Sequence, residues 1–494
     1  MLHSVCIVTI MKNKAILFLF ILNTTLSIAQ TTVQYEVEKL KNDPALQSAV
    51  WGFYAYNLSD NKVEADYNGS LNLVPASVMK TVSTATALEL LGPDFTFKTR
   101  FYVRGEISPE GILNGDLIIR GGGDPSFASE TYSGKCQDCV LNEIIDMLQK
   151  NGIKLIAGDI LADDSYFEAL MTPGGWNFSD IGNRYGASPS GLSFADNTMW
   201  FMFQSPRAGS KAEFIGVKPY VPGIQVYHDV YAGSLGDNAY VYGAEYSNHR
   251  YLSGLITPNQ KAFEVKASMP DPPFTAAYTL YSGLIENGIY VTGIAQNITQ
   301  ARLRVNYDNP NMLLIGTMSS PPLSELVKII NKNSNNLYAE HIHKALSAEK
   351  IKQGSNKESN QIITDFWIKK GISPEQFFVT DGSGLSRSNA ISAKSVVFIL
   401  NYMQGSKHKN VFRESLSIAG VDGTLRNMTK NTKAENNVYA KSGTMNRIKA
   451  YAGYAYTRSG KLITFCIIAN NFNTSSYMMS KKMENMMVKI AELP

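Results

Sequence analysis

The sequence predicts an α+β fold: an antiparallel sheet flanked by helices, built from both ends of the chain and split by a large, mainly β insertion. Three observations predict it. Residues 48–68 have the pattern of a hairpin, and three strand-like runs follow one another between residues 436 and 471. Between Phe101 and Asn311, Gly, Pro and Asn are frequent, strands look short and long helices are rare. Strands at both ends of the chain, with helical segments inside them, indicate one sheet that both termini complete.

Composition sets the class of protein before any motif is considered. The chain has 494 residues, 44% hydrophobic and 18% charged, which is typical of a globular protein with two or three domains. The formal net charge is only +4, and no basic cluster is interleaved with aromatic residues. We therefore expect no nucleic-acid partner.

The N-terminal residues have the pattern of an export signal. Lys12 and Lys14 precede the apolar run AILFLFIL, and a small-x-small cleavage site stands before Gln30, so residues 1–29 are expected to be a signal peptide. Met11 is an alternative start, because a complete signal begins there. No run is long enough to span a membrane, and Gln30, not a cysteine, stands directly after the cleavage point. The mature protein is expected to be exported to the periplasm, soluble or loosely membrane-associated, with no transmembrane anchor.

One helix is expected on each side of the hairpin. The first lies around Val33 to Lys41. The second starts after Pro75, because apolar residues recur at helical spacing, and it ends at Gly92-Pro93.

Ser77 and Lys80 stand three residues apart at the start of the second helix, where they share a face. A serine hydroxyl is a poor nucleophile unless a nearby base takes its proton. Lysine is such a base only when burial or another cation lowers its pKa. Taken alone, the pair is far more typical of a helix-capping serine followed by a solvated lysine, so a catalytic interpretation requires further motifs elsewhere in the chain.

The insertion contains one glycine-rich stretch and a pair of cysteines. The stretch GDLIIRGGGDPSF resembles a strand and its turn, and it is not a phosphate-binding loop because no Gly-Lys-Ser/Thr follows. Cys136 and Cys139 form a C-x-x-C in a polar loop. Neither two further zinc ligands nor a βαβ context accompanies them, so a short loop-closing disulfide is the preferred interpretation. Cys466 lies in an apolar strand and is expected to be a buried thiol, while Cys6 would leave with the signal.

Two motifs in the last third of the chain supply the missing chemistry. Ser334 and Asn336 precede a predicted helix, and Lys441-Ser442-Gly443-Thr444 ends a predicted strand. Ser-x-x-Lys, Ser-x-Asn and Lys-Ser/Thr-Gly, in this order, form the active-site set of penicillin-recognising serine enzymes. A last helix is expected from about Ser475 to Leu493, and in it Met479, Met483, Met486 and Met487 favour core packing over a membrane-surface stripe.

With these motifs the sequence resembles the class C low-molecular-mass penicillin-binding proteins, which are D-alanyl-D-alanine carboxypeptidases and endopeptidases. The resemblance covers nearly the whole mature chain and includes GDILADDSYF, RYGASPSGLSF, DGSGLSRSN and AGVDGTL. The long separation between Ser77 and Ser334 also fits, since that family splits its penicillin-binding domain with a two-part insertion. Lys-Ser-Gly stands where Lys-Thr-Gly is usual, and both carry a hydroxyl.

The resemblance implies a division of the chain. A penicillin-binding/β-lactamase-like transpeptidase domain would comprise residues 30–98 and 312–494. The insertion would have one part at 99–178 and 283–311, and a second part at 179–282.

Chemistry and the resemblance together imply roles for the motif residues. Ser77 would attack the carbonyl between two terminal D-alanines and become acylated, and Lys80 would accept its proton. Lys441, across the cleft, would help keep Lys80 neutral. Ser334 would pass a proton to the leaving amine, and Asn336 would hold Lys80 and the peptide group of the substrate.

The remaining implied roles concern substrate binding. Lys441 and Ser442 would face the terminal carboxylate, and the N–H groups of Ser77 and Thr444 would form the oxyanion hole. Gly443, between Ser442 and Thr444, belongs to the same expected substrate-binding set. In DDSYF, Asp163 would approach the free amine of the diamino-acid side chain. Arg387 and Asn446 match substrate-side positions, and each is equally typical of an ordinary surface residue.

The expected enzyme is thus an exported serine-type D-Ala-D-Ala carboxypeptidase, with endopeptidase activity as a further option. It would act on peptidoglycan stem peptides and be inhibited covalently by β-lactams. No metal or organic cofactor is expected, since His341 and His343 are two apart and face different ways on a helix. Two alternatives remain: a β-lactamase with the same acylation machinery, and a catalytically silent protein that binds the cell wall.

Overall fold

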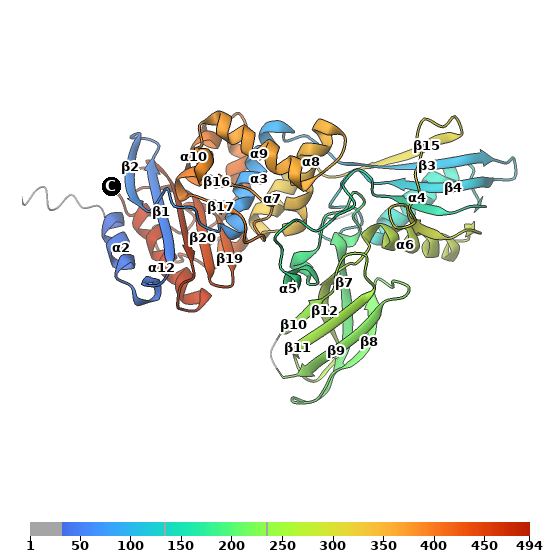
Figure 1. Ribbon diagram of the computed structural model, residues 1–494, viewed down its shortest axis with the longest axis horizontal. Coiled ribbons are helices and arrows are strands. Elements are labelled where there is room, and N and C mark those ends of the chain that lie inside the picture. The colour runs from blue at the N-terminus through green and yellow to red at the C-terminus, as the bar shows by residue number, and fades with distance from the viewer. Residues whose placement is uncertain (1–31, 133–134, 234–235) are drawn as a thin grey trace, which may run out of the picture.

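The computed structural model describes residues 32–132, 135–233 and 236–494, and it forms an elongated molecule with two arms (Figure 1). The expected signal peptide and Cys6 lie outside the described residues. One end of the molecule holds both the first and the last described elements. The other end and the lower arm are formed by the insertion.

Both ends of the chain build one six-stranded antiparallel sheet, as expected. Strand β1 pairs with β21 from Val50 opposite Asn470 to Asn57 opposite Ile463. In spatial order the strands are β18 (Ser417–Ile418), β19 (Val438–Met445), β20 (Ile448–Tyr456), β21 (Leu462–Asn470), β1 (Val50–Asn57) and β2 (Lys62–Tyr67).

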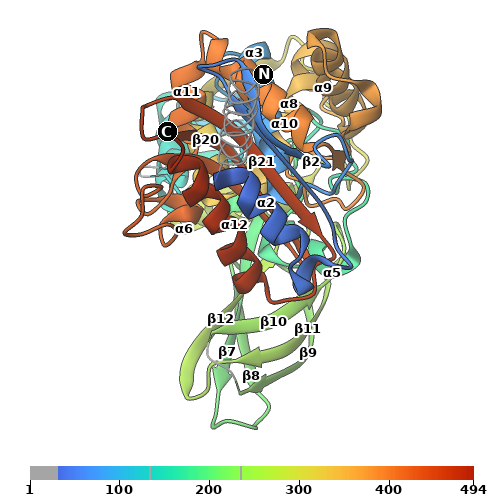
Figure 2. The ribbon, with the colours of Figure 1, turned by 90° about the vertical axis from the view of Figure 1, so that its left-hand side faces the viewer.

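Helices cover both faces of this sheet, so its central strand is buried on both sides. In β21, Phe465 and Ile467 face one core and Cys466 and Ile468 face the other, which explains the continuous apolar run in the sequence. Helices α2 (Thr32–Lys41) and α12 (Ser476–Ala491) lie across one face (Figure 2). The helices on the other side are α3 (Met79–Leu90), α7 (Leu323–Asn333), α8 (Asn336–Ile351), α9 (Asn356–Lys370), α10 (Ala393–Gly405) and α11 (Lys409–Ser415).

Four of the five methionines of α12 are fully buried against α2 and the sheet, which confirms core packing of Met479, Met483, Met486 and Met487. Cys466 is a free, buried thiol, as expected. Cys136 and Cys139 form a disulfide, which lies at the start of a helix instead of in an open loop. In the described part of the chain, no helix is long and apolar enough to cross a membrane.

The first part of the insertion is a seven-stranded mixed sheet packed against two helices. Its helices α4 (Gln137–Lys150) and α6 (Pro272–Glu286) make it richer in long helix than expected. Its strands are β3 (Lys98–Ile107), β4 (Ile112–Arg120), β5 (Leu155–Ile156), β6 (Ile160–Asp163), β13 (Tyr290–Val291), β14 (Ala295–Asn297) and β15 (Met312–Ser319). The division into domains stays a prediction, and the packing places most of α6, and the pairing places β15, with this sheet.

The second part of the insertion, the lower arm in Figure 1, is a sandwich of two three-stranded sheets. One sheet has the order β12 (Gln260–Ser268), β7 (Thr198–Ser205) and β8 (Glu213–Lys218). The other has the order β10 (Asp237–Tyr242), β11 (His249–Ile256) and β9 (Gln225–Ala232). A short helix, α5 (Phe178–Ile181), lies between this arm and the body of the molecule.

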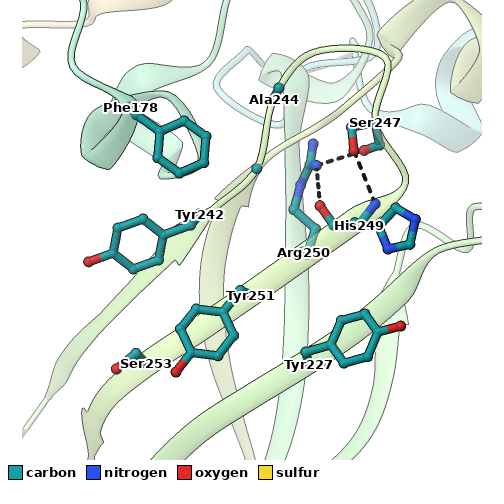
Figure 3. Close-up of a pocket in the computed structure, with 10 residues that line it drawn as sticks. Phe178, Tyr227, Tyr242, Ala244, Ser247, His249, Arg250, Tyr251 and Ser253 are labelled. Carbon is teal, nitrogen blue, oxygen red and sulfur yellow. Dashed lines mark hydrogen bonds between the residues drawn. The ribbon is translucent and has the colours of Figure 1, made fainter.

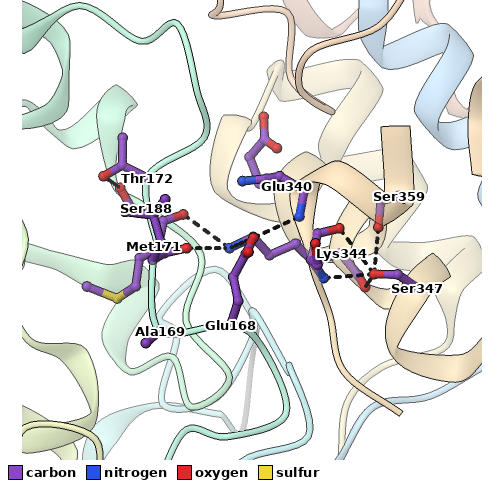
Figure 4. A network of polar contacts seen from close by, with 12 residues as sticks. Glu168, Ala169, Met171, Thr172, Ser188, Glu340, Lys344, Ser347 and Ser359 are labelled. Carbon is purple, nitrogen blue, oxygen red and sulfur yellow. Dashed lines mark hydrogen bonds and ion pairs between the residues drawn. The ribbon is translucent and has the colours of Figure 1, made fainter. Parts of the chain in front are cut away.

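A buried lysine, Lys344 of helix α8, binds the insertion through hydrogen bonds and an ion pair. The amine of Lys344 donates hydrogen bonds to the carbonyl oxygens of Leu170 and Met171, at 3.0 and 3.3 Å, and lies 3.3 Å from the Glu168 carboxylate (Figure 4). Burial lowers the pKa of Lys344, and the Glu168 charge opposes that shift. Because Asn336 begins the same helix, this attachment fixes the insertion relative to the motif residues.

Candidate active site

Ser77 lies in a tight 3-10 turn, Ala76–Val78, directly before α3, and not in the first turn of an α-helix as expected. The preceding residue, Ala76, is fully buried and has a φ of 46°, a left-handed conformation that is strained for a residue with a side chain. This turn directs the Ser77 hydroxyl toward Lys80, which stands in the first turn of α3. The amine of Lys80 donates a hydrogen bond to Ser77 Oγ at 3.0 Å.

Three acceptors hold the Lys80 amine. Besides Ser77, it donates to Asn336 Oδ1 and to the carbonyl oxygen of Ser383, both at 2.6 Å. The side chain is fully buried, and this burial lowers the pKa of Lys80 to about 7. The charges of Asp381 and Glu340 act in the opposite direction and raise it. Lys80 is thus a lysine that can be neutral near pH 7, which is the property a proton acceptor requires.

Ser334 and Asn336 lie at the junction of α7 and α8, as predicted. Ser334 ends α7 in the left-handed conformation, with a φ of 57°, so that its side chain turns back across the cleft. Asn335 caps α8 by accepting from the Tyr338 N–H. Asn336 uses both ends of its amide, since its Oδ1 receives the Lys80 amine and its Nδ2 donates to the Tyr185 carbonyl at 2.7 Å.

Strand β19 brings the third motif to the same place. The Lys441 amine donates to Ser334 Oγ at 2.9 Å and to the Ser442 carbonyl at 2.6 Å. Ser442 Oγ donates to Thr424 Oγ1 at 2.8 Å. The Thr444 hydroxyl accepts from the Lys449 amine at 2.8 Å. The three motifs therefore meet, although they are far apart in the sequence.

Gly443 allows the strand to approach Ser77 closely. A Cβ atom at this position would lie 2.7 Å from the carbonyl oxygen of Pro75 and 3.1 Å from the backbone nitrogen of Ser77. Any side chain here would push β19 away from the turn that carries Ser77. The third motif consequently needs glycine between Ser442 and Thr444 for a steric reason.

The two lysines differ from the expected electrostatic scheme in one respect. Burial is the main cause of the low pKa of Lys80. The pKa of Lys441 lies well below its usual range, first because of burial and then because of the positive charges of Lys80 and Lys449. The expectation that the Lys441 charge keeps Lys80 neutral overlooked the burial of both amines. Desolvation disfavours the charged form of each lysine independently of its neighbour.

Sequence reasoning missed two buried acids behind Lys80. Glu340 accepts from the N–H groups of Gly382 and Ser383, at 3.0 and 2.7 Å, and burial raises the pKa of Glu340 to about 8. Asp381 accepts from the N–H groups of Gly384 and Ser386 and from the Trp176 indole, at 2.6 to 2.8 Å. These bonds shape the loop that presents the Ser383 carbonyl to Lys80. One available signal was the spacing of Glu340, four residues after Asn336 on the same helix.

A cavity of about 510 Å³ opens beside Ser334 and Asn336. The insertion forms one wall of it, through Tyr185 and Asp196 among others. Arg387 and Asn446 lie together near the end of β19, where Arg387 Nη2 donates to the Asn446 carbonyl at 3.3 Å. Among the described residues, no group of three or more His, Cys, Asp or Glu side chains could hold a metal ion.

Asp163 is not brought into contact with the motif residues. It is 1% exposed, and its carboxylate accepts hydrogen bonds from the Ser165 N–H, at 2.8 Å, and from the Tyr307 hydroxyl, both within the insertion. A carboxylate so enclosed is not open to the amine of a ligand. Its suggested role in substrate selection stays a prediction that this geometry does not support.

Comparison with known proteins places this geometry in a family. The model described as the D-Ala-D-Ala carboxypeptidase 3 (S13) family matches residues 33–493. The chain is 27% identical over 433 residues to D-alanyl-D-alanine carboxypeptidase DacB of Haemophilus influenzae, covering 86% of each. It is 27% identical over 462 residues to a D-alanyl-D-alanine carboxypeptidase of an Actinomadura species, covering 89% of this chain and 81% of the relative.

The fold is similar to the crystal structure of penicillin-binding protein 4 from Haemophilus influenzae, with a TM-score of 0.78, 24% identity, and coverage of 92% of this chain and 99% of that one. A second crystal structure of that protein, complexed with a β-lactam, matches with a TM-score of 0.72. The chain belongs to the D-Ala-D-Ala carboxypeptidase 3 (S13) family and is a serine-type D-Ala-D-Ala carboxypeptidase.

Proposed function

We propose that Ser77 is the nucleophile that peptidoglycan stem peptides acylate, and that Lys80 is the base that takes its proton. One observation carries this proposal: the buried Lys80 amine lies 3.0 Å from Ser77 Oγ and has a pKa of about 7. The neutral amine accepts the hydroxyl proton while Ser77 Oγ bonds to the carbonyl carbon between the two terminal D-alanines. The carbonyl oxygen then carries the negative charge.

The backbone at Ser77 and at the neighbouring end of β19 is suited to stabilise that negative charge. The N–H groups of Ser77 and Thr444 would donate to the oxyanion, and the close approach at Gly443 supports their proximity. Loss of one such donor typically costs about 3 kcal/mol of transition-state stabilisation. This estimate gives the oxyanion hole a share of catalysis comparable with that of the base.

Collapse of the tetrahedral intermediate needs a proton on the leaving amine of D-alanine. Ser334 is the group suited to deliver it, because its hydroxyl is bonded to the Lys441 amine at 2.9 Å and can be resupplied from there. Lys441 and the Ser442 hydroxyl would receive the terminal carboxylate of the substrate. Water then hydrolyses the acyl-enzyme and frees Ser77.

The substrate and inhibitor classes follow from the same chemistry. A D-alanyl-D-alanine end occurs on peptidoglycan stem peptides, and a β-lactam presents a strained amide with a nearby carboxylate to the same groups. The β-lactam complex of the Haemophilus influenzae protein supports the proposal that β-lactams acylate Ser77. Expected export to the periplasm would bring the enzyme to this substrate.

Labelling with a fluorescent penicillin tests the nucleophile. The wild type and the control Ser70→Ala, which changes an exposed serine near Ser77 in the chain, should be labelled equally. Ser77→Ala should remain unlabelled while its circular dichroism is unchanged. Labelling of folded Ser77→Ala would exclude the assignment. Mass spectrometry of monomeric and cross-linked muropeptides would then separate carboxypeptidase from endopeptidase activity.

A further inference from the structure

The sheet formed by β10, β11 and β9 has one face that packs inside the sandwich and one that does not. Val230, Val241 and Leu252 point inward and are fully buried, so the residues on either side of them point outward. On the outer face, Tyr242 stands opposite Tyr251, and Tyr251 stands opposite Tyr227. Three tyrosines therefore lie abreast on three neighbouring strands (Figure 3).

Two further rings lengthen this row. The Phe178 ring lies 6.1 Å from that of Tyr242, and the His249 ring is stacked on Tyr227 at 6.2 Å with an angle of 12° between the planes. We call these five residues, Phe178, Tyr227, Tyr242, His249 and Tyr251, the aromatic face. Phe178 is 61% exposed and Tyr227 57%. Rings gathered in this way, and left in water, mark a binding surface.

The aromatic face borders a hollow of about 730 Å³ that is also lined by Arg250. Arg250 is 1% exposed, and its Nη1 donates to the carbonyls of Ser247 and His249 at 2.7 and 3.0 Å. Its Nε has no partner, and no carboxylate pairs with it, among the described residues. Burial lowers the pKa of Arg250 only to about 10, so it stays a cation at neutral pH. Because Arg250 alternates with Tyr251 along β11, it leaves the strand on the side opposite the tyrosines, and its burial keeps it out of direct contact with a ligand on the aromatic face.

The aromatic face is linked to the candidate active site through helix α5 and Tyr185. Phe178 begins α5, and Asp180 of the same helix accepts a hydrogen bond from the Tyr185 hydroxyl at 2.9 Å. The Tyr185 carbonyl accepts from Asn336, and Tyr185 lines the cavity beside Ser334. A polymer whose reacting end lies at Ser77 can therefore extend along the insertion toward these rings.

We propose that the aromatic face binds the glycan strand of peptidoglycan, with N-acetylhexosamine rings stacked on the tyrosines. The proposal rests on the proposed function, because the stem peptides are attached to that strand. The C–H face of a pyranose ring is apolar and fits an aromatic ring, while its hydroxyl and acetamido groups suit the polar groups at the rim. Lys211 pairs with Asp229 at 3.0 Å, so this lysine does not offer an unpaired cation to the phosphates of a nucleic acid.

Glycan binding can be measured separately from peptide cleavage. The probe is peptidoglycan glycan freed of its stem peptides, titrated calorimetrically into the full chain. The double variant Tyr227→Ala/Tyr251→Ala should bind it at least about tenfold more weakly than the wild type, because two stacked rings are lost. The control Tyr290→Ala removes a tyrosine that is 63% exposed but lies on β13, and it should bind as the wild type does. Tyr251→Phe keeps the ring and should retain most of the affinity.

Three results would overturn the proposal: no binding of the peptide-free glycan by the folded wild type, equal binding by the wild type and the double variant, or a loss of affinity in Tyr251→Phe as large as in the double variant. A wild-type dimer that dissociates in the double variant, with no glycan binding, would assign the face to a second copy of this chain. Failure to release D-alanine from a short dipeptide substrate, with glycan binding intact, would count against the proposed function and leave this site standing.

Discussion

The Lys80 amine lies 3.0 Å from the Ser77 hydroxyl in a pocket where burial lowers the pKa of that amine to about 7. A lysine in water would be protonated near pH 7 and could not accept a proton. This contact supports the nucleophile–base pair that we propose, because the fold removes Lys80 from water and because Asn336 and Ser383 hold its amine in place.

Acylation of the wild type should therefore lose rate as the pH falls through about 7. Below that pKa the folded protein holds Lys80 as a cation, and the rate should fall by up to about tenfold for each further pH unit. Rapid mixing with a fluorescent penicillin across this range gives the profile. A rate that stays constant from about pH 8 to pH 5 would contradict the role of Lys80 as base.

Asp381→Asn should move this acid limb to lower pH. The Asp381 charge raises the pKa of Lys80 against the effect of burial, so its removal makes the cation less stable and lowers the pKa further. A shift of about one pH unit corresponds to about 1.4 kcal/mol. Asp365→Asn, which changes an exposed acid on α9, is the matched control and should leave the limb unmoved.

The direction of the shift separates this electrostatic role from a structural one. Asp381 also accepts several backbone N–H bonds, so the variant is expected to unfold at a lower temperature. A loosened loop would lower the rate at every pH. An acid limb that stays in place, or moves to higher pH, would show that Asp381 does not tune Lys80.

Ser442→Ala should weaken transition-state binding of peptides that end in a free carboxylate. The substitution removes a hydroxyl donor that we place at that carboxylate, and a hydrogen bond to a charged group contributes about 1.5 to 3 kcal/mol. Steady-state kinetics should show kcat/KM lower by roughly one to two powers of ten. Ser442→Thr keeps the hydroxyl and should retain most of the activity. If both variants lose activity equally, the hydroxyl is not the group that matters.

Asp163→Asn should act on stability and not on substrate choice. It weakens the acceptor for the Tyr307 hydroxyl inside the insertion, which is expected to cost about 1 to 3 kcal/mol of unfolding free energy. The ratio of kcat/KM for peptides with and without a side-chain amine should stay at the wild-type value. Asp308→Asn, an exposed neighbour of Tyr307, serves as the control for denaturant unfolding. A selective loss on the amine-bearing peptide would restore Asp163 as a substrate-binding residue.

The sequence predicted the elements of the site well because its motifs are local. Ser77 and Lys80 are three residues apart, so any helical turn brings them together, and Asn336 is placed by the start of a strongly periodic helix. The sheet was equally predictable, since β20 and β21 are long apolar runs joined by a short turn. The order of the three motifs then indicated the family.

The remaining parts of the site depend on tertiary packing. Glu340 and Asp381 read as ordinary surface acids, and only the folded chain shows that both are buried behind Lys80. Tyr185 reaches Asn336 from the insertion, through a backbone carbonyl that no side-chain pattern reveals. The enclosed position of Asp163 was equally unforeseeable, because a motif match gives no information about the direction or burial of its carboxylate.

The most direct test of the central claim is mass spectrometry of purified pentapeptide muropeptides after incubation with the wild type and with Ser77→Ala. If Ser77 is the nucleophile of a D-Ala-D-Ala carboxypeptidase, the wild type should shorten each stem by one alanine, and the folded variant should leave the muropeptides unchanged. Release of alanine at the same rate by both proteins, or none from the folded wild type while it hydrolyses penicillin rapidly, would contradict the account.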